Sequence, residues 1–277
     1  MDLTNPKEIK ELLSKYQGRP DKLMGQNFLV DKPALEKIIG ASQLTPEDTV
    51  LEIGPGIGTL THELAGKVKK VIAIEKDAAM IEILKETLKN YQNIEITQGD
   101  ILKIGNWILD IGNYKIVANI PYYLTSHLIR QFLESKNPPK VMILMVQKEV
   151  AQRICAKPPK MSILALSVQF YATPEIISYV KKECFWPSPK VDSAIIKITP
   201  KPSTQQYTSI NSDSFFNVVK AGFSHPRKQL AGNLSKALNM EKKQAQEWLL
   251  KNNVQPQQRA ETLHIEDWVK LVDSLGN

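Results

Sequence analysis

A glycine-rich segment directly after an apolar run is the first feature of the chain that could do chemistry. Residues 50–53 (VLEI) are apolar apart from Glu52, and residues 54–58 (GPGIG) come directly after them. Glycines let the backbone approach a ligand closely at the carboxyl end of a strand. A tight strand-to-helix connection also uses glycines, so the function of this turn depends on the residues at the neighbouring strand ends.

Acidic residues end the next two expected strands. Glu75 lies 21 positions after Gly54, and a carboxylate in that place can accept hydrogen bonds from both hydroxyls of a ribose. Asp100 follows the third strand, where its carboxylate can accept a hydrogen bond from the amino group of adenine. Each acid taken alone is more typical of a surface or a turn. As a series at successive strand ends, the two indicate a nucleoside site.

Two other nucleotide-binding patterns fit the glycine turn less well. A nicotinamide dehydrogenase needs glycine or alanine three residues after its second glycine. Here that position is Thr59, and the third glycine is Gly58. A phosphate-binding P-loop is excluded because no Gly-Lys-Ser/Thr comes after the turn. The spacing therefore favours a nucleoside over a pyrophosphate.

The tetrapeptide Asn119-Ile120-Pro121-Tyr122 follows the fourth expected strand and is the most distinctive segment. The proline biases Ile120 toward an extended conformation. The Ile120 carbonyl and the Asn119 side-chain oxygen can then accept hydrogen bonds from one amine, and Tyr122 supplies a ring on which a base can stack. A turn built by Asn-x-Pro would explain the proline but not the whole tetrapeptide.

Together these segments resemble the rRNA adenine N6-dimethyltransferase family. The shared motifs are QNFL at 26–29, EIGPGIG at 52–58, the acids Glu75 and Asp100, NIPY at 119–122 and FWPSPKVDS at 185–193. Residues 259–263 (RAETL) resemble the Arg-Ala-Glu-x-Leu segment of the branch that modifies small-subunit rRNA. The resemblance runs from about Gly25 to Leu271, nearly the whole chain, and NIPY together with the Pro-x-Pro-Lys-Val segment is highly specific.

The resemblance implies an enzyme that uses S-adenosylmethionine to dimethylate N6 of two adjacent adenines near the 3′ end of small-subunit (16S) rRNA. It implies no metal site. The catalytic residues would be Asn119, Ile120, Pro121, Tyr122 and Phe185, with Phe185 facing Tyr122 across the target base. The residues that would hold S-adenosylmethionine are Gln26, Asn27, Leu29, Glu52, Gly54, Gly56, Gly58, Glu75, Lys76, Asp100, Ile101 and Asn119.

The excess positive charge lies in the second half of the chain. Residues 1–139 hold 17 Lys/Arg and 18 Asp/Glu, whereas residues 140–277 hold 19 and 11. A lysine-rich surface is typical of soluble proteins in general, but beside these motifs it indicates a footprint for rRNA. The family often has Phe-x-x-Arg-Arg-Lys where residues 223–228 read FSHPRK, so Pro226 replaces one arginine. The candidate RNA contacts are Lys148, Arg153, Lys190, Arg227 and Lys228.

These residues require a sheet that brings successive strand ends together. Short apolar runs alternate with helical patterns, which predicts a parallel sheet covered on both faces. The expected strands of this sheet are at 49–53, 71–75, 94–97, 115–118 and 141–147. The expected helices are at 6–17, 33–40, 59–65, 78–88, 126–133 and 148–156. Further strands at 166–171, 175–180 and 194–198 would form an antiparallel edge, and helical patterns fill 213–223, 227–238, 241–251 and 266–275.

The predicted fold class is α/β: a Rossmann-like class I methyltransferase sheet, so named from the family resemblance, with a small C-terminal all-helical domain. The catalytic domain would span residues 1–200, with 1–25 as an N-terminal extension. The helical domain would span 206–277 and contribute to rRNA binding. Residues 200–209, polar and with two prolines, would link them.

Composition predicts a cytoplasmic protein. Cys155 and Cys184 have no metal or disulfide spacing, the charged N-terminus has no apolar signal-peptide region, and no apolar run approaches the roughly 18 residues of a membrane span. The expected partner is small-subunit rRNA or the pre-30S subunit, and the protein is expected to be a monomer.

Three other functions stay open at this stage. A large-subunit (23S) rRNA dimethylase of the antibiotic-resistance type would share the donor site and the Asn-x-Pro-Tyr turn. A ribosome-assembly factor that acts mainly by binding could coexist with catalysis. DNA methylation fits less well, because DNA N6 enzymes typically have Asp-Pro-Pro-Tyr where this chain has Asn119 and Ile120 before Pro121.

Overall fold

The computed structural model describes residues 1–16, 18–20, 25–103, 111–202, 207 and 210–275. The chain forms two compact units, one of residues 1–151 and 174–200 and one of residues 152–173 and 201–277. Residues 152–173, expected in the catalytic domain, thus group with the C-terminal helices. The expected linker at 200–209 lies mostly outside the described residues.

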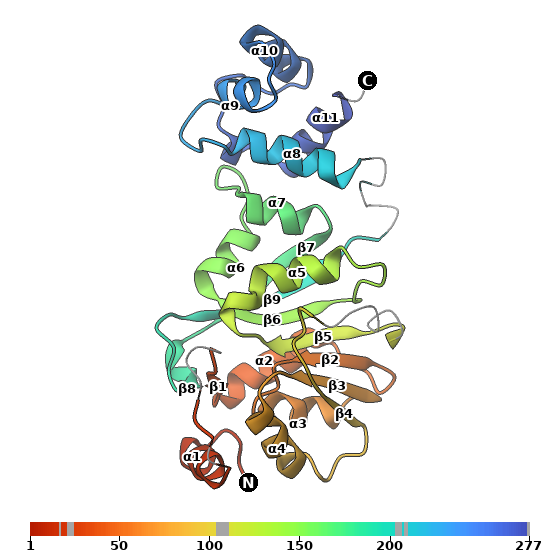
Figure 1. The fold of residues 1–277 in the computed structure, drawn as a ribbon, viewed down its shortest axis with the longest axis vertical. Helices are drawn as coiled ribbons and strands as arrows, with labels where there is room; N and C mark the ends of the chain where they lie inside the picture. Colours follow the sequence, from red (N-terminus) through yellow and green to blue (C-terminus); the bar gives the residue numbers. More distant parts are fainter. Residues whose placement is uncertain (17, 21–24, 104–110, 203–206, 208–209, 276–277) are drawn as a thin grey trace. The chain divides into compact units, whose positions relative to one another are not determined.

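The first unit is built on a seven-stranded sheet in the order β4-β3-β2-β5-β6-β9-β7 (Figure 1). Strands β2 to β6 pair in parallel, and β9 pairs antiparallel with β6. The strands are β2 (Thr49–Ile53), β3 (Lys70–Glu75), β4 (Ile94–Gln98), β5 (Lys115–Asn119), β6 (Met142–Gln147), β7 (Ala172–Val180) and β9 (Ser193–Pro200). The strand order reverses between β2 and β5, and open parallel sheets bind ligands at such a point, beyond the carboxyl ends of the strands.

Helices alternate with the parallel strands, which confirms the predicted α/β class. They are α1 (Pro6–Lys15), α2 (Lys32–Ser42), α3 (Thr59–Ala65), α4 (Ala78–Thr87), α5 (Thr125–Leu133) and α6 (Lys148–Ile154). One buried cluster joins Val50, Val71 and Val117 of the sheet to Ile38 of α2 and Leu64 of α3. The residues that alternate with these valines along each strand point to the opposite face of the sheet and are buried as well. Both faces of the sheet are therefore covered.

A two-stranded ladder absent from the sequence-based prediction joins β1 (Phe28–Leu29) to β8 (Phe185–Trp186). Phe28 pairs with Trp186, and Leu29 pairs with Phe185. Strands of two residues are too short to show an alternating pattern. The ladder brings together two motif segments that lie more than 150 positions apart in the sequence.

The described part of the second unit is mainly helical and contains α7 (Ile163–Gln169), α8 (Ser212–Gly222), α9 (Leu230–Ala237), α10 (Lys242–Lys251) and α11 (Ile265–Asp273). The strand predicted at 166–171 is wrong, because Ser162 caps α7 by accepting from the Ala165 N–H. Leu166 and Phe170 join the buried cluster around Trp268. A short apolar run alone cannot separate a buried strand from a buried helix.

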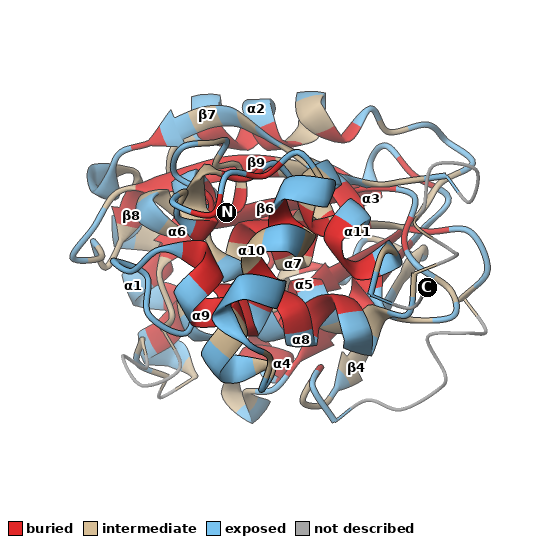
Figure 2. Ribbon diagram, turned by 90° about the horizontal axis from the view of Figure 1, so that it is seen from above, coloured by how far each residue is buried: buried red, intermediate tan, exposed pale blue. Residues whose placement is uncertain are grey.

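The helices of this unit are amphipathic, as Figure 2 shows for α8, which has a buried face and an exposed face. No helix in the described part of the chain is both long and apolar enough to cross a membrane.

Candidate active site

A cavity lies at the carboxyl ends of the parallel strands, beside the point where the strand order reverses. It is lined by residues 25–29, 52–56, 59–60, 74–76, 99–102 and 119–124. Each segment except the first follows or ends a strand or begins the next helix, and carboxyl ends of parallel strands meet at one edge of a sheet. The series of motifs read from the sequence therefore lines one cavity.

Pro121 packs against two glycine positions that no other residue could occupy without strain. Gly25 and Gly54 have φ values of +67° and +68°, in the left-handed region. A Cβ on Gly54 would lie 3.5 Å from Pro121 Cδ, and a Cβ on Gly25 would lie 3.6 Å from Pro121 Cβ. Pro121 thus lies close to both the glycine turn and the N-terminal motif.

Gly58, expected to contact the cofactor, does not line this cavity. It precedes α3 with a φ of +91°, and a Cβ there would lie 3.2 Å from side-chain atoms of Leu84 and Thr87. The glycine at this position therefore serves the close packing of the turn against α4. By contrast, Gly56 does line the cavity, and a Cβ on it would lie 3.2 Å from the ring of Phe28.

Glu75 ends β3 with its carboxylate held by three backbone N–H groups. Oε1 accepts from Lys76 at 2.7 Å and from Asp77 at 2.9 Å, and Oε2 accepts from Gly56 at 3.1 Å. Burial raises the pKa of Glu75, and these three donors act against that effect. A carboxylate has about four lone-pair sites, so the oriented group can still accept from a ligand hydroxyl.

Asp100 and Lys76 form an ion pair at the next strand end. Lys76 Nζ lies 3.1 Å from Asp100 Oδ2, and the Leu102 N–H donates to Asp100 Oδ1 at 3.1 Å. Partial desolvation acts to raise the pKa of Asp100, but the Lys76 ammonium and the Leu102 N–H outweigh it and hold the pKa below its usual value. Asp100 is therefore an anionic acceptor at neutral pH, with buried Ile101 beside it.

Glu52 is the most unusual group in the cavity wall. It is only 1% exposed, and its Oε2 has no hydrogen-bond partner among the described residues. Burial raises the pKa of Glu52 to about 8; the Thr61 hydroxyl acts against this effect, and the nearby Glu75 carboxylate adds a smaller upward contribution. A buried polar atom without a partner is costly, and a cationic ligand group would supply one.

The amide of Asn119 is oriented by the N-terminal motif. Its Nδ2 donates to the Asn27 carbonyl oxygen at 3.1 Å, and Asn27 Nδ2 donates in turn to the Gly25 carbonyl at 2.9 Å. Since a carbonyl can only accept, the amide nitrogen of Asn119 must face Asn27. The Asn119 Oδ1 atom is thereby left as an acceptor. Gln26, the neighbouring candidate, donates to Asp77 Oδ2 at 2.8 Å.

Tyr122 and Ile120 line the cavity, but Phe185 does not. Phe185 is 3% exposed and packs in the cluster that contains Leu29 and α2. Its pairing with Leu29 in the β1–β8 ladder fixes it there. That Phe185 faces a base held against Tyr122 therefore stays a prediction, and Phe185 is buried in this structure.

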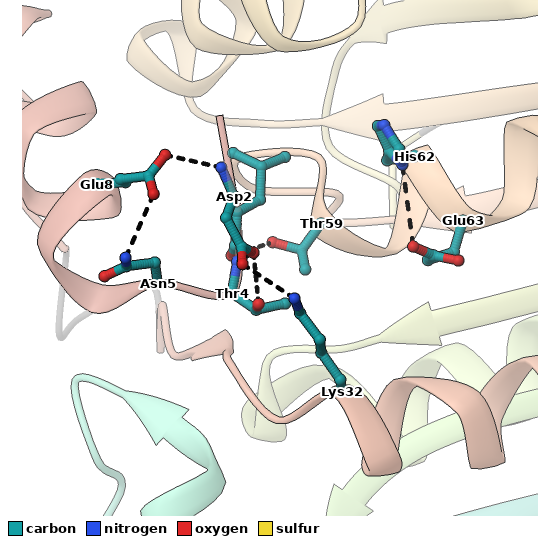
Figure 3. A network of polar contacts seen from close by, with 9 residues as sticks. Asp2, Thr4, Asn5, Glu8, Lys32, Thr59, His62 and Glu63 are labelled. Atoms are coloured by element: carbon teal, nitrogen blue, oxygen red, sulfur yellow. Dashed lines mark hydrogen bonds and ion pairs between the residues drawn. The ribbon is translucent and has the colours of Figure 1, made fainter.

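The N-terminal segment contacts the start of α3, directly after the glycine turn, which the sequence patterns did not indicate (Figure 3). Thr59 Oγ1 donates to the Leu3 carbonyl at 3.2 Å, and Asp2 pairs with Lys32 at 3.0 Å. Buried Leu12 and Leu13 of α1 share a cluster with Ile57 of the turn. Residues 1–16 thus pack against the glycine turn and the start of α3.

The five candidate RNA contacts are distributed over both units. Lys148 and Lys190 belong to the first unit, and Arg153, Arg227 and Lys228 belong to the second. Lys148 is partly exposed, and the other four are exposed. Lys148 lies 5.3 Å from the centre of the Tyr179 ring, itself 51% exposed. Pro226, where the resemblance leads one to expect an arginine, is also exposed.

The chain is similar over nearly its full length to enzymes that methylate ribosomal RNA. A family model described as ribosomal RNA adenine dimethylase matches residues 19–276. A Dehalococcoides mccartyi protein named ribosomal RNA small subunit methyltransferase A is 42% identical over 273 residues, 98% of this chain and 94% of the relative.

Two crystal structures have the same fold. A dimethyladenosine transferase from Plasmodium falciparum matches with a TM-score of 0.75 and 30% identity, covering 89% of this chain and 96% of that one. The 23S rRNA methyltransferase ErmE matches with a TM-score of 0.73 and 25% identity, covering 91% of this chain and 100% of that one.

Proposed function

The chain belongs to the ribosomal RNA adenine dimethylase family, and from this premise we propose that it dimethylates N6 of adenines in small-subunit rRNA. The support is the 42% identity to a small-subunit methyltransferase together with the cavity that joins the glycine turn to the Asn119–Tyr122 turn. We place its substrate at two adjacent adenines near the 3′ end of the 16S rRNA, in the pre-30S subunit.

The cavity suits S-adenosylmethionine, which carries a nucleoside, an ammonium group and a sulfonium centre with an activated methyl group. Glu75 would accept from the ribose hydroxyls, and Asp100 would accept from the adenine amino group. Glu52 would offer its buried Oε2 atom, which has no partner among the described residues, to the ammonium group. The backbone at Gly54 and Gly56 and the motif at residues 26–29 would complete the walls.

Asn119 and Ile120 would position the target amine. Adenine N6 is a poor nucleophile because its lone pair is delocalised into the ring, so orientation and a preorganised electrostatic environment are what the protein can contribute. The Asn119 Oδ1 atom and the Ile120 carbonyl would accept hydrogen bonds from the two N–H groups of the amine. This would direct the nitrogen lone pair at the methyl group. The same oxygens would stabilise the positive charge that develops on nitrogen.

Tyr122 would stack on the target base after it leaves its own stack; such stacking contributes about 1–3 kcal/mol per base. Phe185 would be the candidate for the opposite face of the base. Lys148, Arg153, Lys190, Arg227 and Lys228 would contact rRNA phosphates, as positively charged surfaces do.

The test uses donor with a labelled methyl group and ribosomal subunits from cells that lack the modification. Mass spectrometry of the digested rRNA should find labelled dimethyladenosine in the small subunit only. Label in large-subunit rRNA would instead indicate an enzyme of the antibiotic-resistance type. No label in either RNA, with donor binding intact, would refute methyl transfer. A catalytically dead variant that restores subunit maturation would indicate a mainly binding role.

A further inference from the structure

A fully buried serine at the same edge of the sheet bonds to the tyrosine of the catalytic turn. Ser193 is 0% exposed, and its Oγ lies 2.7 Å from the hydroxyl oxygen of Tyr122. The two residues are 71 positions apart. Nothing in the sequence motifs indicates what the hydroxyl of Ser193 does.

The topology explains how this contact forms. Ser193 begins β9, which runs antiparallel to β6, so Ser193 pairs with Gln147 at the carboxyl end of β6. Asn119 at the end of β5 pairs with Met145 of β6. One antiparallel strand in an otherwise parallel region therefore brings the start of β9 to the edge where the catalytic turn begins.

Hydrogen bonds hold the backbone at or beside both partners. The residue before Ser193, Asp192, accepts from the Lys148 N–H at 3.0 Å through its carbonyl and from the Lys182 N–H at 3.2 Å through Oδ1. On the other side, the Tyr122 carbonyl accepts from Thr125 Oγ1 at 3.0 Å. With both main chains held, the hydroxyl–hydroxyl bond determines where the ring of Tyr122 points.

We propose that Ser193 is a positioning residue that holds the ring of Tyr122 in the orientation that receives the target adenine. The adjacent Tyr123 also lines the cavity but is 57% exposed. Burial raises the pKa of Tyr122, which keeps its hydroxyl neutral and able to share a proton with Ser193. The inference rests on the proposed function, since it assigns Tyr122 to the base.

The experiment is a double-mutant cycle with Ser193→Ala, Tyr122→Phe and the two together, measured as kcat, RNA KM and donor Kd. Loss of one neutral hydrogen bond predicts a kcat about tenfold lower for each single variant. The donor Kd should stay within about twofold, because neither hydroxyl is needed for the donor site. The double variant should be no slower than either single variant, since both remove the same bond.

Ser42→Ala is the matched control. Ser42 is 1% exposed, and its Oγ donates to the Ile38 carbonyl at 2.7 Å, at the end of α2. This variant should lose a similar amount of thermal stability and keep wild-type kcat. If Ser193→Ala does not fold, Tyr122→Phe alone decides, because it keeps the ring and removes only the hydroxyl.

Wild-type kcat in the folded single variants, or multiplicative losses in the double variant, would overturn the role of Ser193. A loss confined to donor Kd would do the same. If the wild-type protein itself methylates no rRNA, the proposed function fails first, so the two failures are distinguishable.

Discussion

Glu52 should link donor binding to pH, and Glu52→Gln should remove that link. In the free protein the carboxyl is buried, its Oε2 has no partner among the described residues, and its pKa is about 8. The proposed donor brings an ammonium group to this wall of the cavity. Binding should therefore favour the ionised form of Glu52 and release a proton.

The size of the effect follows from the pKa. With a pKa of about 8, Glu52 is protonated about ten times more often than ionised at pH 7, and about a hundred times more often at pH 6. If the donor binds only the ionised form, its Kd should be about ninefold higher at pH 6 than at pH 7. About 0.9 protons should leave per donor bound at pH 7. In this range the donor's own amine stays mostly protonated, since an α-amino group has a pKa of about 7.7–8.0.

Isothermal titration calorimetry in two buffers of different ionisation enthalpy measures both quantities. Glu52→Gln should bind more weakly at pH 7, with little change in Kd between pH 6 and 7 and with little proton release. Glu63→Gln on α3, whose carboxylate is 46% exposed, is the control and should behave as the wild type does. Equal proton release by the wild type and Glu52→Gln would refute the reasoning.

Three further predictions concern catalysis and stability. Asn119→Ala should lower kcat by about 100-fold or more in single-turnover assays while donor Kd changes less than about tenfold, because an acceptor for the reacting amine is lost; a wild-type rate would show that its assigned role is wrong. Gly222→Ala should destabilise the helical unit by about 1–3 kcal/mol in urea unfolding, because the added Cβ would overlap the ring of buried Trp268. Gly232→Ala within α9, where a Cβ would meet nothing within 4 Å, should instead stabilise it by about 0.5–1 kcal/mol; the opposite order of the two variants would contradict the packing. The folded pKa of Glu52 lies above its ordinary 4.5, so its contribution to stability is fully present below about pH 4.5 and is lost as pH rises through 8. Melting temperatures across this range should fall less for Glu52→Gln than for the wild type.

The sequence predicted the fold best where glycines or other turn residues mark the ends of a strand or helix. Strand Thr49–Ile53 and helix Thr59–Ala65 have the predicted bounds, because three glycines separate an apolar run from a helical pattern. The run at 166–171 has no such marker, and tertiary packing around Trp268 selects a helix there. The assignment of residues 152–173 to the helical unit likewise depends on contacts that no local pattern encodes.

The residues of the site divide in the same way. Glu75, Asp100 and Asn119 could be placed together from the sequence because they end successive parallel strands, whose carboxyl ends share one edge. The burial of Phe185 and the contact from Ser193 to Tyr122 depend on the β1–β8 ladder and on the direction of β9. The sequence could not distinguish the role of Gly58, because packing against α4 requires the same residue type as close approach to a ligand.

A crystal structure with the demethylated donor product bound tests the central claim most directly. We predict that its ribose lies on Glu75, its adenine amine on Asp100 and its ammonium on Glu52, with its sulfur facing Asn119 Oδ1 across the place for the target amine. A product bound elsewhere, or bound here with its sulfur turned away from Asn119, would contradict that claim.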